Sequence, residues 1–296
     1  MAALKEVRLR MKAVKGIQQV TNAMKMVATV KMRRVQDRLF QARPYTDALY
    51  EMAGRLGAAG EAAGDDLHPL LAKSRSDGKE AVVVMGSDRG LCGAFNMNLC
   101  RHLLSAIEGT RPGLIPVGRK VRDLLSRQSA HRASYEILRE YEKLPFPATW
   151  ADAEKIARDL LSIYTFSGLS RMRLAYQRFV SPGISRMTLA PWIPFAMPLP
   201  PRTAAAAGPA IELRCEPSVP AVLDLVLPRA LTAQLYRALL ESQASEQGAR
   251  MVAMENATTN ASELVGDLNL LANKLRQTGI TKELLEITTG AEALGN

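Results

Sequence analysis

Several kinds of side chain and segment are scarce in this chain of 296 residues. Its three cysteines form no CxxC pair, which argues against a disulfide scaffold and fits a reducing compartment best. Its three histidines lie far apart and match no metal-ligand spacing. No apolar run reaches about 18 residues, so no membrane-spanning helix is predicted. The N-terminus lacks the apolar core of a signal peptide, so no cleavable targeting segment is expected.

Proline is absent from both ends of the chain. The first 43 residues contain none, the 68 residues after Pro228 contain none, and half of the 16 prolines fall within 191–220. Both proline-free ends are rich in Ala, Met, Leu, Lys, Arg, Glu and Gln, which lose little conformational freedom in a helix. The sequence therefore predicts long terminal helices that pair with each other, over residues 1–57 and 218–296.

The N-terminal segment has the apolar spacing of a coiled coil. Two groups with 3-4-3 spacing are joined by a step of three, which should overwind the seam locally. The members are Leu4, Val7, Met11, Val14, and then Ile17, Val20, Met24, Val27. The pair Arg43-Pro44 predicts a kink or a helix end, because a residue before proline avoids the helical conformation.

The C-terminal helix is expected to begin near Pro228, since proline suits the first turn of a helix. Its seam alternates steps of three and four at Met254, Ala257, Ala261, Leu264, Leu268, Leu271 and Leu275. A helix of this length needs a packing partner, because propensity alone does not stabilise it. The N-terminal helix is the natural partner.

The middle of the chain, 80–217, reads as an α/β domain with a mostly parallel, Rossmann-like sheet, because strand and helix patterns alternate along it. The stretch 58–79, rich in Ala, Gly and Asp, reads as a linker. The expected strands cover 81–85, 114–117 and 171–176, with an edge strand near 211–215. The expected helices cover 96–107, 119–128 and 151–166.

Positive charge is concentrated at the N-terminus. Residues 1–43 hold eleven basic and two acidic side chains, so they carry +9 of the formal net charge of +10. Such a segment indicates a macromolecular partner of opposite charge. Nucleic acid is one candidate, although the first aromatic residue is Phe40 and no base-stacking or recognition-helix pattern is present. A protein partner with acidic surfaces is at least as good a candidate.

A glycine-containing loop follows the first middle strand. It includes Ser87, Asp88, Arg89, Gly90 and Gly93. Strand, glycine-rich turn and helix are the context of a phosphate site, but the glycine spacing fits neither GxGxxG nor a P-loop. A structural turn is therefore favoured over phosphate binding. Cys92 in the same loop is interpreted as structural, since no base is placed near it. No paired-carboxylate, Ser/His/Asp or metal arrangement is apparent.

Four motifs in order resemble those of the F-type ATP synthase gamma subunit. The match runs from residue 4 to about 290 and is weakest in the middle. The motifs are TNAMKMVA at 21–28 with KMRR at 31–34, SDRGLCG at 87–93, SEQGARMVAM at 245–254, and NKLRQ at 273–277 with ITKE at 280–283.

This resemblance implies a rotor in which the terminal helices form an antiparallel coiled coil inside a ring of three alpha and three beta subunits. The middle domain would contact the epsilon subunit and the membrane ring of c subunits, with one copy of the chain per complex. The implied contacts with the alpha/beta ring are Met24, Lys25, Arg33, Arg34, Arg250, Arg276, Gln277 and Thr281.

The resemblance further implies a non-catalytic chain that binds no cofactor and no nucleic acid. It would lie peripherally on the cytoplasmic face of a bacterial membrane and couple proton flow to ATP synthesis or hydrolysis on beta. A basic coiled-coil protein that binds nucleic acid is the alternative. A nucleotide-binding α/β enzyme with helical arms is a third possibility.

Overall fold

A computed structural model describes residues 2–63, 68–71, 78–131, 135–195 and 215–294. The helices and strands, in chain order, are α1 (Ala2–Ala63), β1 (Lys79–Met85), α2 (Phe95–Ala106), β2 (Gly113–Val117), α3 (Arg119–His131), α4 (Trp150–Phe166), β3 (Leu169–Ser181), β4 (Ile184–Ile193) and α5 (Val219–Leu294). The chain divides into two compact units. Unit 1 contains Met1–Ala28 and Arg250–Asn296, and unit 2 contains Thr29–Ala249.

Unit 2 is built on a four-stranded sheet with the strand order β2-β1-β3-β4. β1 pairs in parallel with β2 and with β3, whereas β3 and β4 are antiparallel. β2 is buried throughout and β1 is buried after Lys79, as their unbroken apolar runs predict for parallel strands covered on both faces. The predicted fold class, a mostly parallel α/β layer with long terminal helices, is confirmed.

The sequence analysis missed β4, which occupies the edge of the sheet next to β3. The hairpin between β3 and β4 turns at Pro182 and Gly183, and Gly183 has φ +83°. Proline followed by a glycine of positive φ is the signature of a type II turn. The dipeptide could therefore have revealed the hairpin. Of the edge strand expected near 211–215, residues 211–214 lie outside the described part of the chain.

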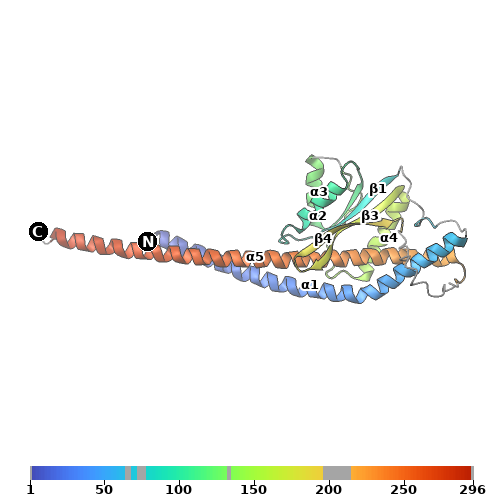
Figure 1. Ribbon diagram of the computed structural model, residues 1–296. Coiled ribbons are helices and arrows are strands. Elements are labelled where there is room, and N and C mark those ends of the chain that lie inside the picture. The colour runs from blue at the N-terminus through green and yellow to red at the C-terminus, as the bar shows by residue number, and fades with distance from the viewer. Residues whose placement is uncertain (1, 64–67, 72–77, 132–134, 196–214, 295–296) are drawn as a thin grey trace, which may run out of the picture. The chain divides into compact units, whose positions relative to one another are not determined.

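The sheet lies between two layers of helices, as Figure 1 shows. α2 and α3 cover one face, where a buried apolar cluster includes Val82, Leu99 and Leu125. α1, α4 and α5 cover the other face through a larger cluster that includes Leu39, Leu160 and Leu231. α4 begins at a capping box, in which Thr149 and Asp152 each accept a hydrogen bond from the other's backbone N–H. The terminal helices are thus part of the core of unit 2.

Prolines do not end the terminal helices. A kink or a helix end was predicted at Arg43-Pro44; α1 runs through Pro44, so of these two the helix end is excluded. α5 begins at Val219, with Pro228 in its interior rather than in its first turn. Proline inside a helix costs about 3 kcal/mol, and buried residues on both sides of each proline offset this cost. Leu39 and Leu49 flank Pro44, and Leu227 precedes Leu231 around Pro228. α1 also includes 58–63, the beginning of the stretch expected to be a linker.

In unit 1 the two terminal helices form an antiparallel pair. The Nζ of Lys25 lies 2.7 Å from the Oε1 of Glu255, and the Oγ1 atoms of Thr21 and Thr258 are 2.7 Å apart. Farther toward the N-terminus, Val14 packs with residues farther along α5. The apolar contact consists of Val7, Met11 and Val14 with Ala261, Val265 and Leu268.

The seam of α1 differs from the predicted one in unit 1. Ile17, Val20 and Val27 are 55–59% exposed. The less exposed positions instead continue an unbroken heptad after Val14, through Gln18, Thr21, Lys25 and Ala28. A regular 3.5-residue period avoids the overwinding that a step of three requires. The ion pair and the threonine contact supply partners for two of the polar seam residues.

The seam of α5 is shifted in the same way. Met254, Ala261, Leu268 and Leu275 lie on it as predicted, but Leu264 and Leu271 are 39% and 44% exposed. The intervening seam positions are Thr258, Val265 and Ala272. The prediction from apolar character alone therefore assigned Leu264 and Leu271 to the seam, whereas the adjacent residues Val265 and Ala272 occupy it.

We predict that the threonine contact couples the two helices of unit 1. Thr21→Val should leave the Thr258 hydroxyl with only the Met254 carbonyl of its own helix. Thr258→Val should leave the Thr21 hydroxyl with only the Gln18 carbonyl. The loss of unfolding free energy in the double variant should be smaller than the sum of the two single losses by about 0.5–1 kcal/mol, because two valines can pack against each other. Hydrogen exchange of the seam amides measures this difference. Additive single effects would show that the contact contributes nothing specific.

Candidate partner-contact surfaces

The structure separates the predicted contact residues of unit 1 into buried and exposed groups. Arg250 is 9% exposed, and Lys25 is half-buried beside Glu255. Met24 is half-buried at the edge of the seam. Arg276, Gln277 and Thr281 are exposed. The Thr281 hydroxyl donates to the Gln277 carbonyl one turn earlier, at 3.0 Å. The last three residues thus offer side chains on the surface of α5, whereas Lys25 and Arg250 contribute to packing.

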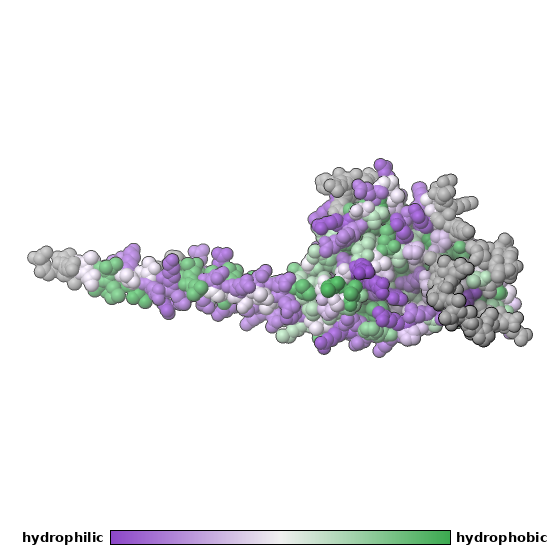
Figure 2. All heavy atoms as spheres, viewed as in Figure 1, coloured by the Kyte–Doolittle hydropathy of each residue, from purple (hydrophilic) through white to green (hydrophobic). Residues whose placement is uncertain are grey.

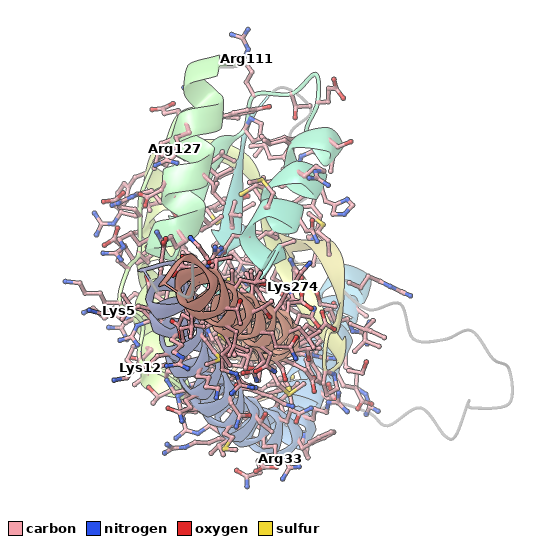
Figure 3. The ribbon with its side chains drawn as sticks, turned by 90° about the vertical axis from the view of Figure 1, so that its left-hand side faces the viewer. Lys5, Lys12, Arg33, Arg111, Arg127 and Lys274 are labelled. Atoms are coloured by element: carbon pink, nitrogen blue, oxygen red, sulfur yellow. The ribbon has the colours of Figure 1, made fainter. Side chains whose placement is uncertain are left out.

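The other two predicted contacts, Arg33 and Arg34, are exposed on the α1 segment of unit 2. They flank Met32 and Val35, which are buried. Figure 3 shows the side chain of Arg33 projecting outward from α1. Both arginines are therefore placed where a partner could reach them.

The exposed side of α1 in unit 1 carries an apolar strip that the sequence analysis missed. Its members repeat with steps of four and three, parallel to the seam, and all are exposed: Leu9, Ala13, Gly16, Val20, Ala23 and Val27. Ile17 lies beside this apolar strip and is also exposed. A strict heptad continued from Val14 would have placed these residues outside the seam. Uncharged side chains at these positions form a second face along the helix.

A basic stripe runs beside the apolar strip. It consists of Lys5, Arg8, Lys12 and Lys15, which are exposed at steps of three, four and three. Figure 3 shows Lys5 and Lys12 projecting on the same side of α1. The outer surface of this helix is therefore divided lengthwise into an apolar and a cationic part.

The loop after β1 is held by its own hydrogen bonds. The Ser87 N–H donates to the Asn96 side-chain oxygen at 3.0 Å, and the Asn96 amide donates to the Ser87 hydroxyl at 2.7 Å. Asp88 accepts from the backbone N–H of Arg119 at 3.0 Å, and the Ser87 carbonyl accepts from that of Lys120 at 2.9 Å. The loop thus connects the first turns of α2 and α3, using polar groups that a phosphate would otherwise need.

α5 anchors the same edge of the sheet in unit 2. The Ser242 hydroxyl donates to the carbonyl of Met85, the last residue of β1, at 2.9 Å. The Ser245 hydroxyl donates to the carbonyl of Gln177 in β3 at 2.8 Å. Both serines are buried. The carboxyl end of β1 and the adjoining part of β3, where a doubly wound fold would bind a ligand, are therefore contacted by α5.

We predict that Ser242→Ala destabilises unit 2 by about 1–3 kcal/mol, because it deprives a buried carbonyl of its donor. The free energy of unfolding in urea measures this change. Ser162→Ala is the matched control, since the Ser162 hydroxyl donates only within its own helix, to the Asp159 carbonyl. Equal effects of the two substitutions would contradict a special role for the Ser242 bond.

The titratable side chains give no sign of a reactive centre within the described ranges. No group of three or more His, Cys, Asp or Glu side chains there could hold a metal ion. Cys92 is buried against the Asn96 amide, 3.4 Å away. Burial raises the pKa of the Cys100 thiol from 9.0 to about 12, and burial also raises the pKa values of Tyr50, Tyr164 and Tyr176.

We predict a loss of stability in alkali. A thiol whose pKa is raised in the folded state contributes its full stability below the unfolded pKa, and loses it as pH rises from about 9 toward about 12. The ordinary pKa of a cysteine thiol is 9.0. Above that pH, Cys100→Ala should therefore make the unfolding free energy depend less steeply on pH. Urea titrations in reducing buffer measure that slope. Cys215→Ala, at a half-buried position, should keep it, and an unchanged slope in Cys100→Ala would contradict the assignment.

Solved structures of ATP synthase chains share this fold. A chain of the mitochondrial ATP synthase of Euglena gracilis matches with a TM-score of 0.67 and 20% identity over 99% of this chain and 95% of that chain. A chain from the central stalk and c-ring of the Tetrahymena thermophila enzyme matches with a TM-score of 0.58 and 24% identity, over 80% of this chain and 99% of that chain. At these identities the likeness concerns the fold.

Sequence relatives identify the family. A family model described as ATP synthase matches residues 3–294. The ATP synthase gamma chain of Desulforamulus reducens is 38% identical over 295 residues, covering 99% of this chain and 100% of the relative. That of Anaeromyxobacter sp. strain K is 39% identical over 299 residues, with coverage of 99% and 100%. The chain therefore belongs to the ATP synthase gamma chain family. The nucleic-acid-binding alternative gains no support from these matches.

Proposed function

We propose that this chain is the rotor of an F-type ATP synthase, which couples proton flow across a membrane to ATP synthesis or hydrolysis on the beta subunits. The observation that carries this proposal is the antiparallel pairing of α1 with α5 in unit 1, in a chain whose full-length relatives are ATP synthase gamma chains. A shaft of two paired helices resists bending and twisting better than a single helix.

The mechanism follows from the unlike sides of the shaft. The apolar strip and the basic stripe lie side by side along α1 and present unlike surfaces, so a surrounding ring of similar sites meets a different surface at each rotational position. A difference in contact free energy shifts each site between its open and closed states. Rotation driven by ion flow can thus be converted into binding and release of nucleotide.

The partners are the alpha and beta subunits, arranged as a ring of three each, together with the epsilon subunit and the c-ring. Met24, Arg33, Arg34, Arg276, Gln277 and Thr281 are the proposed contacts with the ring, and Lys25 and Arg250 would support them from the seam. Catalytic residues belong to other chains of the complex. The described helices include none long and apolar enough to cross a membrane. We place one copy of the chain peripherally, on the cytoplasmic face of a bacterial membrane.

The working division of the chain is proposed as a shaft of 1–57 and 218–296, a connection at 58–79, and a domain of 80–217 directed toward epsilon and the c-ring. The loop of Ser87, Asp88, Arg89, Gly90 and Gly93 serves that domain as a structural element. Its hydrogen bonds to Asn96 and to the start of α3 support this role.

A substitution at Met24 tests the proposal. Met24→Lys places a charge beside the uncharged strip of α1, where an attraction to the ring would hold the rotor in one position. Fewer protons should be pumped per ATP hydrolysed, measured in membrane vesicles that contain the complex. Met24→Leu, which keeps an apolar side chain of similar volume, is the control and should pump normally. Normal pumping by Met24→Lys would contradict the proposed contact.

A further inference from the structure

The hairpin of β3 and β4 extends beyond the rest of the sheet. β3 is paired with β1 only as far as Ala175, which lies opposite Val84, but it continues to Ser181. Beyond Ala175 the described partner of β3 is β4 alone, through Ser181 opposite Ile184. The hairpin tip, defined as residues 176–188, is therefore a two-stranded ribbon at the edge of unit 2.

Two arginines lie directly opposite each other on this ribbon. Arg178 pairs with Arg186 in the strand register, and both are exposed. Side chains at opposed positions have Cβ atoms about 4.5–5.5 Å apart, and like charges there repel each other. Across the described residues neither guanidinium forms an ion pair or hydrogen bond. The fold therefore places two cations together without a counter-charge of its own.

One carboxylate of α5 near this part of β3, Glu241, is engaged within unit 2. Glu241 and Arg178 both act on the pKa of Tyr176, Glu241 raising it and Arg178 lowering it. Glu241 is 3% exposed, and its Oε1 accepts a hydrogen bond from the Nε of Arg237 at 3.1 Å. It is thus a buried partner of Arg237 and leaves the exposed arginine pair uncompensated.

Apolar side chains flank the arginines at the turn. Val180 and Ile184 are 56% and 62% exposed. Figure 2 shows strongly hydrophobic and strongly hydrophilic atoms side by side on the surface near where Figure 1 draws the beginning of β4, next to the hairpin turn. β-branched residues suit a strand, but on this ribbon tip more than half of the surface of each stays exposed. A partner that covered them would remove this apolar surface from water.

The tip is held in place by the body of unit 2. An added Cβ on Gly248 of α5 would lie 3.4 Å from the backbone nitrogen of Gly183 and 3.6 Å from a ring carbon of Phe179. The Gln177 amide donates to the carbonyl of Phe95 at 2.7 Å, which attaches the ribbon to α2. A pre-organised surface loses little conformational entropy on binding.

We propose that the hairpin tip is a docking surface for an acidic, partly apolar segment of a partner protein. Carboxylates of that segment would bind between Arg178 and Arg186, and its apolar side chains would cover Val180 and Ile184. Paired guanidinium and carboxylate groups match in geometry as well as charge. This inference goes beyond the proposed function, which directs the domain of 80–217 toward epsilon and the c-ring but names no contact residue on the hairpin.

Charge and area favour a protein over other anionic partners. Binding to an anionic membrane surface typically uses clusters of about 4–8 basic residues, and nucleic acid also requires many phosphate contacts. The hairpin tip presents two arginines beside a small apolar surface, which suits a short acidic peptide segment.

The test uses the purified ATP synthase complex that carries this chain, with p-benzoylphenylalanine in place of Ile184. Photo-cross-linking followed by mass spectrometry should identify a partner-subunit peptide rich in Asp and Glu. The double variant Arg178→Glu, Arg186→Glu should lower the cross-link yield about tenfold, and Arg178→Gln, Arg186→Gln should lower it less. A cross-link to lipid, competition by phosphatidylglycerol vesicles, or a peptide without acidic residues would overturn the proposal.

Arg111→Glu, Arg127→Glu is the matched control. It changes the net charge equally, at exposed arginines whose side chains Figure 3 shows projecting away from the sheet. This control should keep the cross-link yield of the unaltered complex, and an equal loss would attribute the effect to net charge and overturn the proposal. Circular dichroism and thermal unfolding of the isolated variants verify their folding. A chain that folds but enters no complex would contradict the proposed function rather than the docking surface.

Discussion

The antiparallel pairing of α1 with α5 is the constraint on which the rest of the structure depends. Helices of 62 and 76 residues cannot be stabilised by propensity alone. In unit 1 each is the other's partner, through the cluster around Val14 and Leu268 and through the polar contacts of Thr21 and Lys25. In unit 2 both helices join the core beneath the sheet. The two ends of the chain are therefore folded only when they are together.

The regular heptad of the pairing determines what α1 presents to a partner. A seam that followed the most apolar residues would have buried Ile17, Val20 and Val27. The observed seam accepts Gln18, Thr21 and Lys25 instead, because an even twist keeps the two helices in register over many turns. The displaced apolar residues then form an outer strip beside the basic stripe. The apolar and basic outer faces, which a rotor needs to be unlike, are a consequence of this seam register.

Much of unit 2 could be predicted from short, strongly patterned segments. Val82 to Val84 are apolar without interruption and form part of β1, an inner strand of the sheet, and the helix signals of α2 and α4 are correct within a residue or two. Ser87 and Asp88, which the sequence places in a predicted structural turn, form hydrogen bonds to α2 and α3. β4 was missed because its pattern is weak and partly exposed, although Pro182 and Gly183 indicated the turn that precedes it.

The sequence by itself determined that both ends are helical, that a mostly parallel sheet lies between them, and which family the motifs resemble. These properties depend on local propensity, apolar periodicity and residue order. Tertiary structure decided the seam, the continuation of α1 through Pro44 and of α5 through Pro228, and the exposure of each proposed contact residue. The physical reason is that each of these features has a local free-energy cost, such as a proline inside a helix. That cost is offset only by burial against residues far along the chain. Leu39 acquires that burial only when α5 and the sheet are in place.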